Sequence, residues 1–341
     1  MMQSGFFDLS ERYQKLSELG DPLEAIQAAV NWERFRPTLN KVVEKERKSN
    51  AGRKRYDPVL MFKVLVLQGL YNLADDQTEF QIRDRFSFLR FLNLTPEGKI
   101  PDAKTIWLFR EALKAKGLMD GLFAAFDRDL TARGYHAQKG MVIDARLVEV
   151  PKQRNTREEN AVVKEGLVPT DWPDQPAKMR QKDVEARWTK KRGHSYYGYK
   201  NHINVDVKHK LIRRYQVTEA SVHDSQTLNA LLDKRNTNQT VWADSAYRSD
   251  TISQTLARKN IVNRIHYRPW HSTALPEWQR QTNQHRSTIR ARVEHVFGHQ
   301  VTSMRMTVIR GIGLARATFR IGLANLVYNM SRVAQLEKMA A

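Results

Sequence analysis

The sequence predicts an α/β protein, in which a helical N-terminal region precedes a mixed β-sheet with flanking helices and a final helical segment. Two observations predict this class. Apolar residues recur at helical spacing through roughly the first 135 residues. From residue 140 onward, short runs rich in β-branched and aromatic residues alternate with helical patterns.

The N-terminal region contains several helix signals in succession. "DPVLMFKVLVLQGLYNL" begins with Asp57 as a cap and Pro58 at the first helical position, and it is apolar on almost every side. "DQTEFQIRDRFSFLRFL" and "DAKTIWLFREALKAKGLMDGLFAAFDRDLTARG" supply further helices, which Gly117 and Gly134 end. We therefore predict an all-helical domain over residues 1–136.

The strands begin with "MVIDARLVEV" at residues 141–150, and "YYGYKNHINVDVKHKLIRRYQVTEA" predicts two strands joined in a hairpin. "HDSQTLNALLDKR", "TVWAD", "SDTISQTLARKN", "IVNRI" and "STIRARVEHVFGHQ" complete the order β-β-β-α-β-α-β-α. This order matches an RNase H-like fold, a mixed five-stranded sheet whose first three strands form an antiparallel meander. We expect it to occupy residues 137–301, with a C-terminal helical segment at 302–341.

Residues 151–195 depart from this pattern. They are polar, rich in Lys, Arg, Pro and Trp, and show no clear periodicity. We predict a basic excursion between the first two strands, because loops of this length within a compact domain are usually functional or disordered.

The amino-acid composition and net charge favour one class of binding partner. Lys and Arg number 57 against 37 Asp and Glu, a formal charge of +20, while 41% hydrophobic residues indicate a globular protein. Such a positive field favours nucleic acid as a partner over a membrane surface, for which no amphipathic Lys-rich helix is evident. The absence of cysteine excludes thiolate chemistry and disulfides. The N-terminus lacks the features of a signal peptide, so we expect a cytoplasmic protein, associated with the nucleoid when it binds DNA.

Three carboxylate residues lie on or directly after elements that are neighbours in the predicted fold. Asp144 lies on the first strand, Asp244 follows the fourth, and Glu294 lies on the final long helix. The first strand is central in this fold, the fourth is its neighbour and the helix packs beside both, so the three side chains can converge. An all-oxygen site prefers Mg²⁺ or Mn²⁺, and two such ions can activate a water or a 3′-hydroxyl for attack on a phosphodiester.

Each carboxylate also has an ordinary structural interpretation. Asp144 could form a turn or cap, Asp244 could cap a helix, and Glu294 could pair with Arg290 at i−4. The three together, in this strand order, favour the metal site.

The chain resembles the DDE transposases of bacterial insertion sequences, specifically the IS-five type within the broader IS-four superfamily. The resemblance covers nearly the whole length, and its motifs are "NWERFRPTLNKV", "RYDPVLMFKVLVLQGLYNLADDQTEFQIRDRFSFLRFLNL", "PDAKTIWLFREAL", "VIDARLVEVP", "GYKNHINVDVKHKLIRRYQVTEASVHDSQTLNALL" and "VWADSAYRS". It implies that Asp144, Asp244 and Glu294 bind two Mg²⁺ ions. It also implies at least a homodimer, because two DNA ends must be brought together.

The superfamily also carries a Tyr-x2-Arg-x3-Glu-x6-Lys signature around the glutamate. Arg290 and Glu294 fit it, whereas the Tyr position is Ser287 and the Lys position is Val301. The roles of that Tyr and Lys in contacting terminal phosphates are therefore not carried over to this chain.

Cations interleaved with aromatic residues predict contacts with double-stranded DNA. The predicted DNA-binding residues are Trp188, Lys190, Lys191, Arg192, Tyr199, Lys200, Arg290, Arg292, Arg53, Lys54 and Arg55. In the alternative interpretation, the tyrosines begin the second strand and half of them face the core. Residues 251–320 include 12 Lys and Arg but only two acidic residues. This excess of positive charge favours DNA lying across this surface.

The predicted function is a transposase that binds the terminal inverted repeats of its element, cleaves at the ends and joins the freed 3′-OH to target DNA. Two alternatives stay open: a metal-dependent nuclease on the same fold without strand transfer, and a catalytically inactive DNA-binding protein derived from a transposase.

Overall fold

The computed structural model describes residues 8–43, 55–191, 193–269 and 274–340. The chain forms two compact units, one comprising Met1–Asp129 with Leu326–Ala341 and the other Leu130–Asn325. Helix α14 (Leu314–Ala340) carries residues of both units. The boundaries expected from the sequence, at 136 and 301, remain a prediction.

The first unit is helical, as the sequence predicts. Its elements are α1 (Asp8–Glu18), α2 (Pro22–Ala29), η1 (Trp32–Phe35), α3 (Arg36–Asn40), η2 (Lys41–Val43), α4 (Pro58–Tyr71), α5 (Asp75–Asp84), α6 (Phe86–Leu92), α7 (Ala103–Ala115) and α8 (Met119–Ala132), the last of which extends into the second unit. Asp57 caps α4 by accepting hydrogen bonds from the backbone N–H groups of Val59 and Leu60 at 2.8 and 3.2 Å. The ring of Phe62 on α4 packs on Phe35 with centroids 4.8 Å apart, which places α4 in the core.

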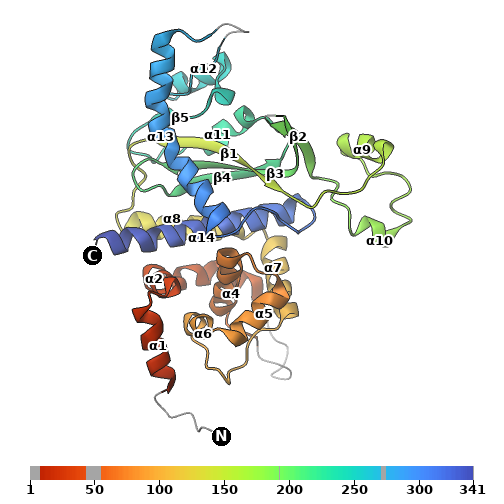
Figure 1. Ribbon diagram of the computed structural model, residues 1–341, viewed down its shortest axis with the longest axis vertical. Helices are drawn as coiled ribbons and strands as arrows, with labels where there is room; N and C mark the ends of the chain where they lie inside the picture. Colours follow the sequence, from red (N-terminus) through yellow and green to blue (C-terminus); the bar gives the residue numbers. More distant parts are fainter. Residues whose placement is uncertain (1–7, 44–54, 192, 270–273, 341) are drawn as a thin grey trace. The chain divides into compact units, whose positions relative to one another are not determined.

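The second unit contains the sheet (Figure 1). Its elements are β1 (Met141–Glu149), α9 (Arg157–Lys164), α10 (Pro176–Met179), β2 (Arg187–Lys191), β3 (His194–Asp206), β4 (Ile212–Glu219), η3 (Asp224–Thr227), α11 (Leu228–Leu231), β5 (Thr240–Trp242), η4 (Ser245–Tyr247), α12 (Asp250–Arg258), β6 (Val262–Asn263) and α13 (Glu277–Thr302). Strands β1, β3 and β4 form the antiparallel meander, and β5 and β6 continue the sheet parallel to β1. The RNase H-like topology is confirmed.

The predicted number of five strands is wrong, because the sheet has six strands within the described part of the chain. The additional strand, β2, lies in the segment predicted as an excursion and pairs antiparallel with the first residues of β3. Four of its five residues are cationic or polar, so the sequence carries no apolar alternation that would reveal a strand.

The helix predicted over "HDSQTLNALLDKR" is much shorter than expected. It consists of the 3₁₀ turn η3 and a single turn, α11. The buried amide of Asn204 on β3 donates to the carbonyl of Leu231 at 2.6 Å, so this carbonyl is bonded to the sheet rather than to a further helical turn.

Helices cover the sheet, and α13 runs across its strands in Figure 1. Apolar residues of β1, β5, α11 and α12 form one buried cluster, which includes Met141, Ile143, Leu231, Val241 and Leu256. A buried amide network connects β3, α13 and α14: Asn325 accepts from Asn201 and Gln300, both at 2.8 Å. These contacts join β3 to the two long helices.

Gly140 fixes the start of β1. Its φ of +99° is unfavourable for other residues, and a Cβ there would lie 2.2 Å from the Trp242 ring. The Asn236 side chain accepts from the Gly140 N–H at 3.0 Å and donates to its carbonyl at 2.9 Å. The strand therefore enters the sheet at a defined register beside β5.

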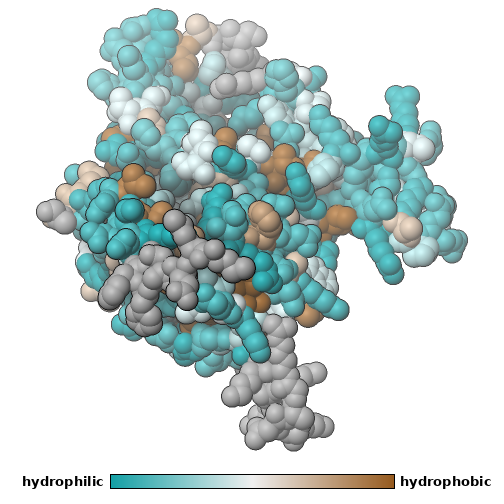
Figure 2. Space-filling model, turned by 60° about the horizontal axis from the view of Figure 1, so that its bottom comes forward, coloured by the Kyte–Doolittle hydropathy of each residue, from teal (hydrophilic) through white to brown (hydrophobic). Residues whose placement is uncertain are grey.

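The segment between β1 and β2 forms a lobe that carries α9 and α10 and projects from the sheet in Figure 1. Its small core is built around Trp172, which is fully buried. Glu159 accepts hydrogen bonds from the Trp172 indole at 2.8 Å and from Lys178 at 2.7 Å. On the face seen in Figure 2, the surface is largely hydrophilic, with scattered apolar patches.

No helix in the described part of the chain is long and apolar enough to cross a membrane.

Candidate active site

Asp144 lies on β1 opposite Ile203 of β3 and is only 8% exposed. Its Oδ2 accepts a hydrogen bond from Arg290 Nη2 at 2.8 Å, and its Oδ1 accepts one from the Ala145 N–H at 2.8 Å. Burial raises the pKa of this carboxyl, and the positive charge of Arg290 opposes that rise. The buried carboxylate is therefore compensated by a cation from α13.

Glu294 lies one helical turn beyond Arg290 on α13. The same Nη2 atom that contacts Asp144 lies 3.4 Å from Glu294 Oε1. The glutamate side chain is 64% exposed and can change rotamer freely. The i, i+4 pair expected as the ordinary interpretation is thus present, and it brings Glu294 and Asp144 to a common cation.

Asp244 follows β5, the strand that pairs with β1. It caps η4, because its Oδ1 accepts from the Ala246 N–H at 2.9 Å. The carboxylate is half-buried, and its negative charge contributes to the raised pKa of Asp144. Asp244 therefore serves as a cap and also lies within electrostatic range of Asp144.

The donor chemistry of these residues suits a hard divalent cation, because all three offer carboxylate oxygens. Among the residues that the structure describes, no three His, Asp or Glu side chains lie close enough together to hold a metal ion. In the structure, the Arg290 guanidinium interacts with both Asp144 and Glu294. A bound cation would have to replace it there.

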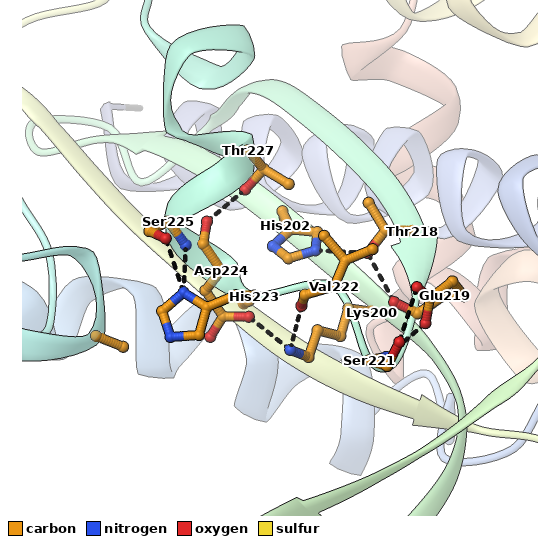
Figure 3. Close-up of polar contacts among 12 residues, drawn as sticks. Lys200, His202, Thr218, Glu219, Ser221, Val222, His223, Asp224, Ser225 and Thr227 are labelled. Atoms are coloured by element: carbon orange, nitrogen blue, oxygen red, sulfur yellow. Dashed lines mark hydrogen bonds and ion pairs between the residues drawn. The ribbon is translucent and has the colours of Figure 1, made fainter. Parts of the chain in front are cut away.

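A fourth carboxylate, Asp224, lies at the start of η3 (Figure 3), and its charge acts on Tyr247 together with the charges of Asp144 and Asp244. Asp224 accepts from Lys200 Nζ at 2.8 Å, and the same ammonium donates to the Val222 carbonyl at 2.7 Å. The preceding residue, His223, is a neighbour of Ser225, whose Oγ lies 2.7 Å from its Nδ1. Asp224 is the acidic residue of an ion pair at the edge of the candidate site.

Tyr247, at the end of η4, was not predicted from the sequence. Its ring belongs to the apolar cluster and is fully buried, while its hydroxyl has no hydrogen-bond partner among the residues that the structure describes. Burial raises the pKa of the phenol well above its ordinary value, and the charges of Asp144, Asp224 and Asp244 raise it further. In the sequence the only signal is its position three residues after Asp244, and an aromatic residue there is easily taken for core.

Two histidines near these groups are held neutral. Burial lowers the pKa of His202 on β3 to about 4, and its Nε2 lies 2.9 Å from Thr218 Oγ1. Burial also lowers the pKa of His266 to about 4, and the positive charge of Arg290 lowers it further.

The predicted DNA-binding residues occupy different environments. Lys190 and Lys191 are exposed on β2, and Trp188 beside them is 45% exposed. Arg55 is exposed in the first unit, and half-buried Arg292 donates to the Val207 carbonyl at 2.8 Å. Arg53, Lys54 and Arg192 lie outside the described residues.

The structure contradicts the predicted contact of Tyr199 with DNA. The residue is fully buried, and its hydroxyl donates to the Asp183 carboxylate, with its oxygen 2.8 and 2.9 Å from the two carboxylate oxygens. It cannot stack on a base in this conformation, because its ring faces the core, as the alternative interpretation of the tyrosines expected. Lys200 is likewise largely buried in its ion pair with Asp224.

Comparison with known proteins identifies the family of the chain. A family model described as a transposase DDE domain matches residues 135–330, and another, described as a transposase domain (DUF772), matches residues 10–112. A cryo-EM structure of the piggyBac transposase synaptic complex with hairpin DNA is similar at 11% identity and a TM-score of 0.46, over 94% of this chain and 76% of that chain. A similarity this weak adds nothing to the assignment. Because the DDE-domain model alone covers more than half of the sequence, the chain belongs to the DDE transposases.

Proposed function

We propose that this transposase binds the terminal inverted repeats of an insertion sequence, cleaves a phosphodiester at each element end and joins the freed 3′-OH to target DNA. One observation carries the proposal. A buried carboxylate on the central strand, Asp144, shares one cationic nitrogen with the exposed Glu294 and lies within electrostatic range of Asp244. A buried acid held in this way is suited to exchange one cation for another.

Asp144, Asp244 and Glu294 would hold two Mg²⁺ ions, for which Mn²⁺ would substitute. When bound, such ions lower the pKa of an attacking water or 3′-hydroxyl and stabilise the leaving oxygen. Buried Asp144 would provide the fixed ligand, because its β1 backbone is paired with β3 and with β5. Exposed Glu294 would provide the adaptable ligand, because it can rotate without disturbing the core.

Arg290 would act in two ways. In the structure it neutralises Asp144 and holds Glu294 beside it. Once released from these acids, its guanidinium would be free to donate to a phosphate oxygen of the bound DNA. The proposed active centre therefore contains its own phosphate ligand on the helix that carries Glu294.

The DNA would lie against exposed cations of both units. In the second unit, Lys190 and Lys191 would bind phosphates, Trp188 would stack on an accessible base, and Arg292 would contribute positive charge. In the first unit, the cations Arg53, Lys54 and Arg55 would contact the end sequence. We propose a homodimer as the active form, because two element ends must be joined to one target.

The test uses labelled duplexes that carry the inverted repeats flanking the gene, incubated with Mg²⁺ or Mn²⁺. Wild type should cut at the ends and form joined products, whereas Asp144→Asn and Asp244→Asn should bind the duplex without cutting it. Asp250→Asn is the matched control, since this exposed residue lies six positions beyond Asp244 and should leave cleavage unchanged.

Two results would contradict the proposal. Cleavage without any joined product, with paired ends and target supplied, would favour a nuclease. Binding by wild type without cleavage in either metal would favour an inactive DNA-binding protein.

A further inference from the structure

We infer that Tyr247 is a positioning residue of the metal centre: its hydroxyl is the donor that Asp144 gains when a divalent cation displaces Arg290. The inference rests on the proposed function, because it concerns the metal-bound state of the same carboxylates. The position of Tyr247, between the core and the acidic residues, carries it.

The buried hydroxyl of Tyr247 would be energetically unfavourable if it formed no hydrogen bond in any state of the protein. It is fully buried and unbonded in the described structure. A buried unsatisfied hydroxyl costs about 1–3 kcal/mol, whereas phenylalanine would fill the same space without that cost. Buried polar groups without a partner are uncommon in native proteins and call for an explanation.

The surroundings of this hydroxyl point to a carboxylate as its missing partner. Tyr247 closes η4, whose first backbone group is capped by Asp244, and η3 with Asp224 at its start packs against η4. The Tyr247 ring lies in the same buried cluster as Ile143 and Ala243, the residues that directly precede Asp144 and Asp244 on and after the paired strands β1 and β5. Because burial, and then the charges of these acids, raise its pKa, the phenol stays protonated and can only donate to a carboxylate.

The exchange of cations at Asp144 explains when the hydrogen bond would form. In the structure, Asp144 uses its two oxygens to accept from Arg290 and from the Ala145 N–H. Displacement of Arg290 removes one charge-assisted hydrogen bond and frees the carboxylate to reorient. The Tyr247 hydroxyl would then orient the carboxylate as a ligand, which is the usual task of groups that hydrogen-bond to metal ligands.

The experiment measures Mn²⁺ affinity by calorimetry and by the rise of the melting temperature with Mn²⁺, using the full chain. Tyr247→Phe should melt at or above the wild-type temperature without metal, and its half-saturating Mn²⁺ concentration should rise about tenfold. Tyr199→Phe is the matched control from the same unit. It loses its hydrogen bonds to Asp183, so it should melt lower while its Mn²⁺ affinity stays that of wild type.

The possible outcomes separate this inference from the proposed function. Wild-type Mn²⁺ affinity in Tyr247→Phe would overturn the inference alone, provided that Asp144→Asn loses binding. A lower melting temperature with unchanged affinity would make the hydroxyl merely structural and would also overturn it. Equal Mn²⁺ binding by wild type and Asp144→Asn would overturn the metal site itself, and the inference with it.

Discussion

Asp144 shows how a single residue can be costly for the fold and useful for the site. Its carboxylate is buried, and removing the charged partner of a buried ion pair typically costs about 3–5 kcal/mol. Arg290 supplies that partner from α13 at 2.8 Å. A position that must always be neutralised by a cation is well placed to bind a metal ion, so the structural and the functional interpretations of Asp144 do not exclude each other.

His202 gives a prediction about pH at the same scale. Its pKa of about 4 in the folded protein lies below the ordinary 6.5, so the unfolded chain takes up the proton first as the pH falls. The stability present above pH 6.5 is therefore lost progressively toward pH 4. His202→Gln removes this titration and keeps an amide near Thr218.

Urea unfolding at about pH 7.5 and about pH 4.5 tests this expectation. Wild type should lose about 2–3 kcal/mol more than His202→Gln between the two pH values. Equal losses in the two proteins would mean that His202 is already protonated in the fold or is accessible to water.

At the scale of elements, Asp183 connects the lobe that contains α9 and α10 to the rest of the second unit. Its buried carboxylate accepts from the Tyr199 hydroxyl on β3, the Ala186 N–H at 2.9 Å and the Gly313 N–H at 3.0 Å, just before α14. This one anion thus joins its own segment to β3 and to the residues that precede α14. The lobe is attached to the sheet by a specific contact rather than by its two chain connections alone.

Replacing this anion tests the attachment. Asp183→Asn keeps the size of the side chain but weakens its charge-assisted bonds, so the free energy of unfolding should fall by about 2 kcal/mol. Limited proteolysis should also cut faster between residues 151 and 186. Asp174→Asn, an exposed acid of the same lobe, is the control and should change neither result. Unchanged proteolysis in Asp183→Asn would show that other contacts hold the lobe.

These elements also show what could be predicted from the sequence. Periodicity and end signals predicted the strand order and the cap of α4, because both depend on neighbouring residues. Strand β2 was not predicted, because four of its five residues are cationic or polar. Tyr199 was assigned to DNA binding because the alternation of residues along a strand does not by itself show which side faces the core. The Asp183 contacts join positions up to 130 residues apart, and no local pattern encodes such a contact.

Charge belongs to the scale of the whole molecule. The formal charge of +20 acts over distances longer than any single contact, attracting DNA in a manner that salt screens. Exposed Lys190 and Lys191 on β2 would turn part of this general attraction into defined phosphate contacts. Loss of these two cations should therefore change the salt dependence of binding more clearly than its sequence preference.

Salt titration of DNA binding measures this contribution. Each phosphate contact contributes about 0.9 to the slope of log K against log salt, so Lys190→Gln with Lys191→Gln should flatten the slope by about 1.8. The binding preference for end-bearing over random duplex should stay the same, because phosphate contacts carry no sequence information. Lys208→Gln with Lys234→Gln is the control, since these exposed lysines of the same unit lie outside the proposed interface. An equal flattening in both pairs would mean that net charge alone, and not the β2 lysines, sets the salt dependence.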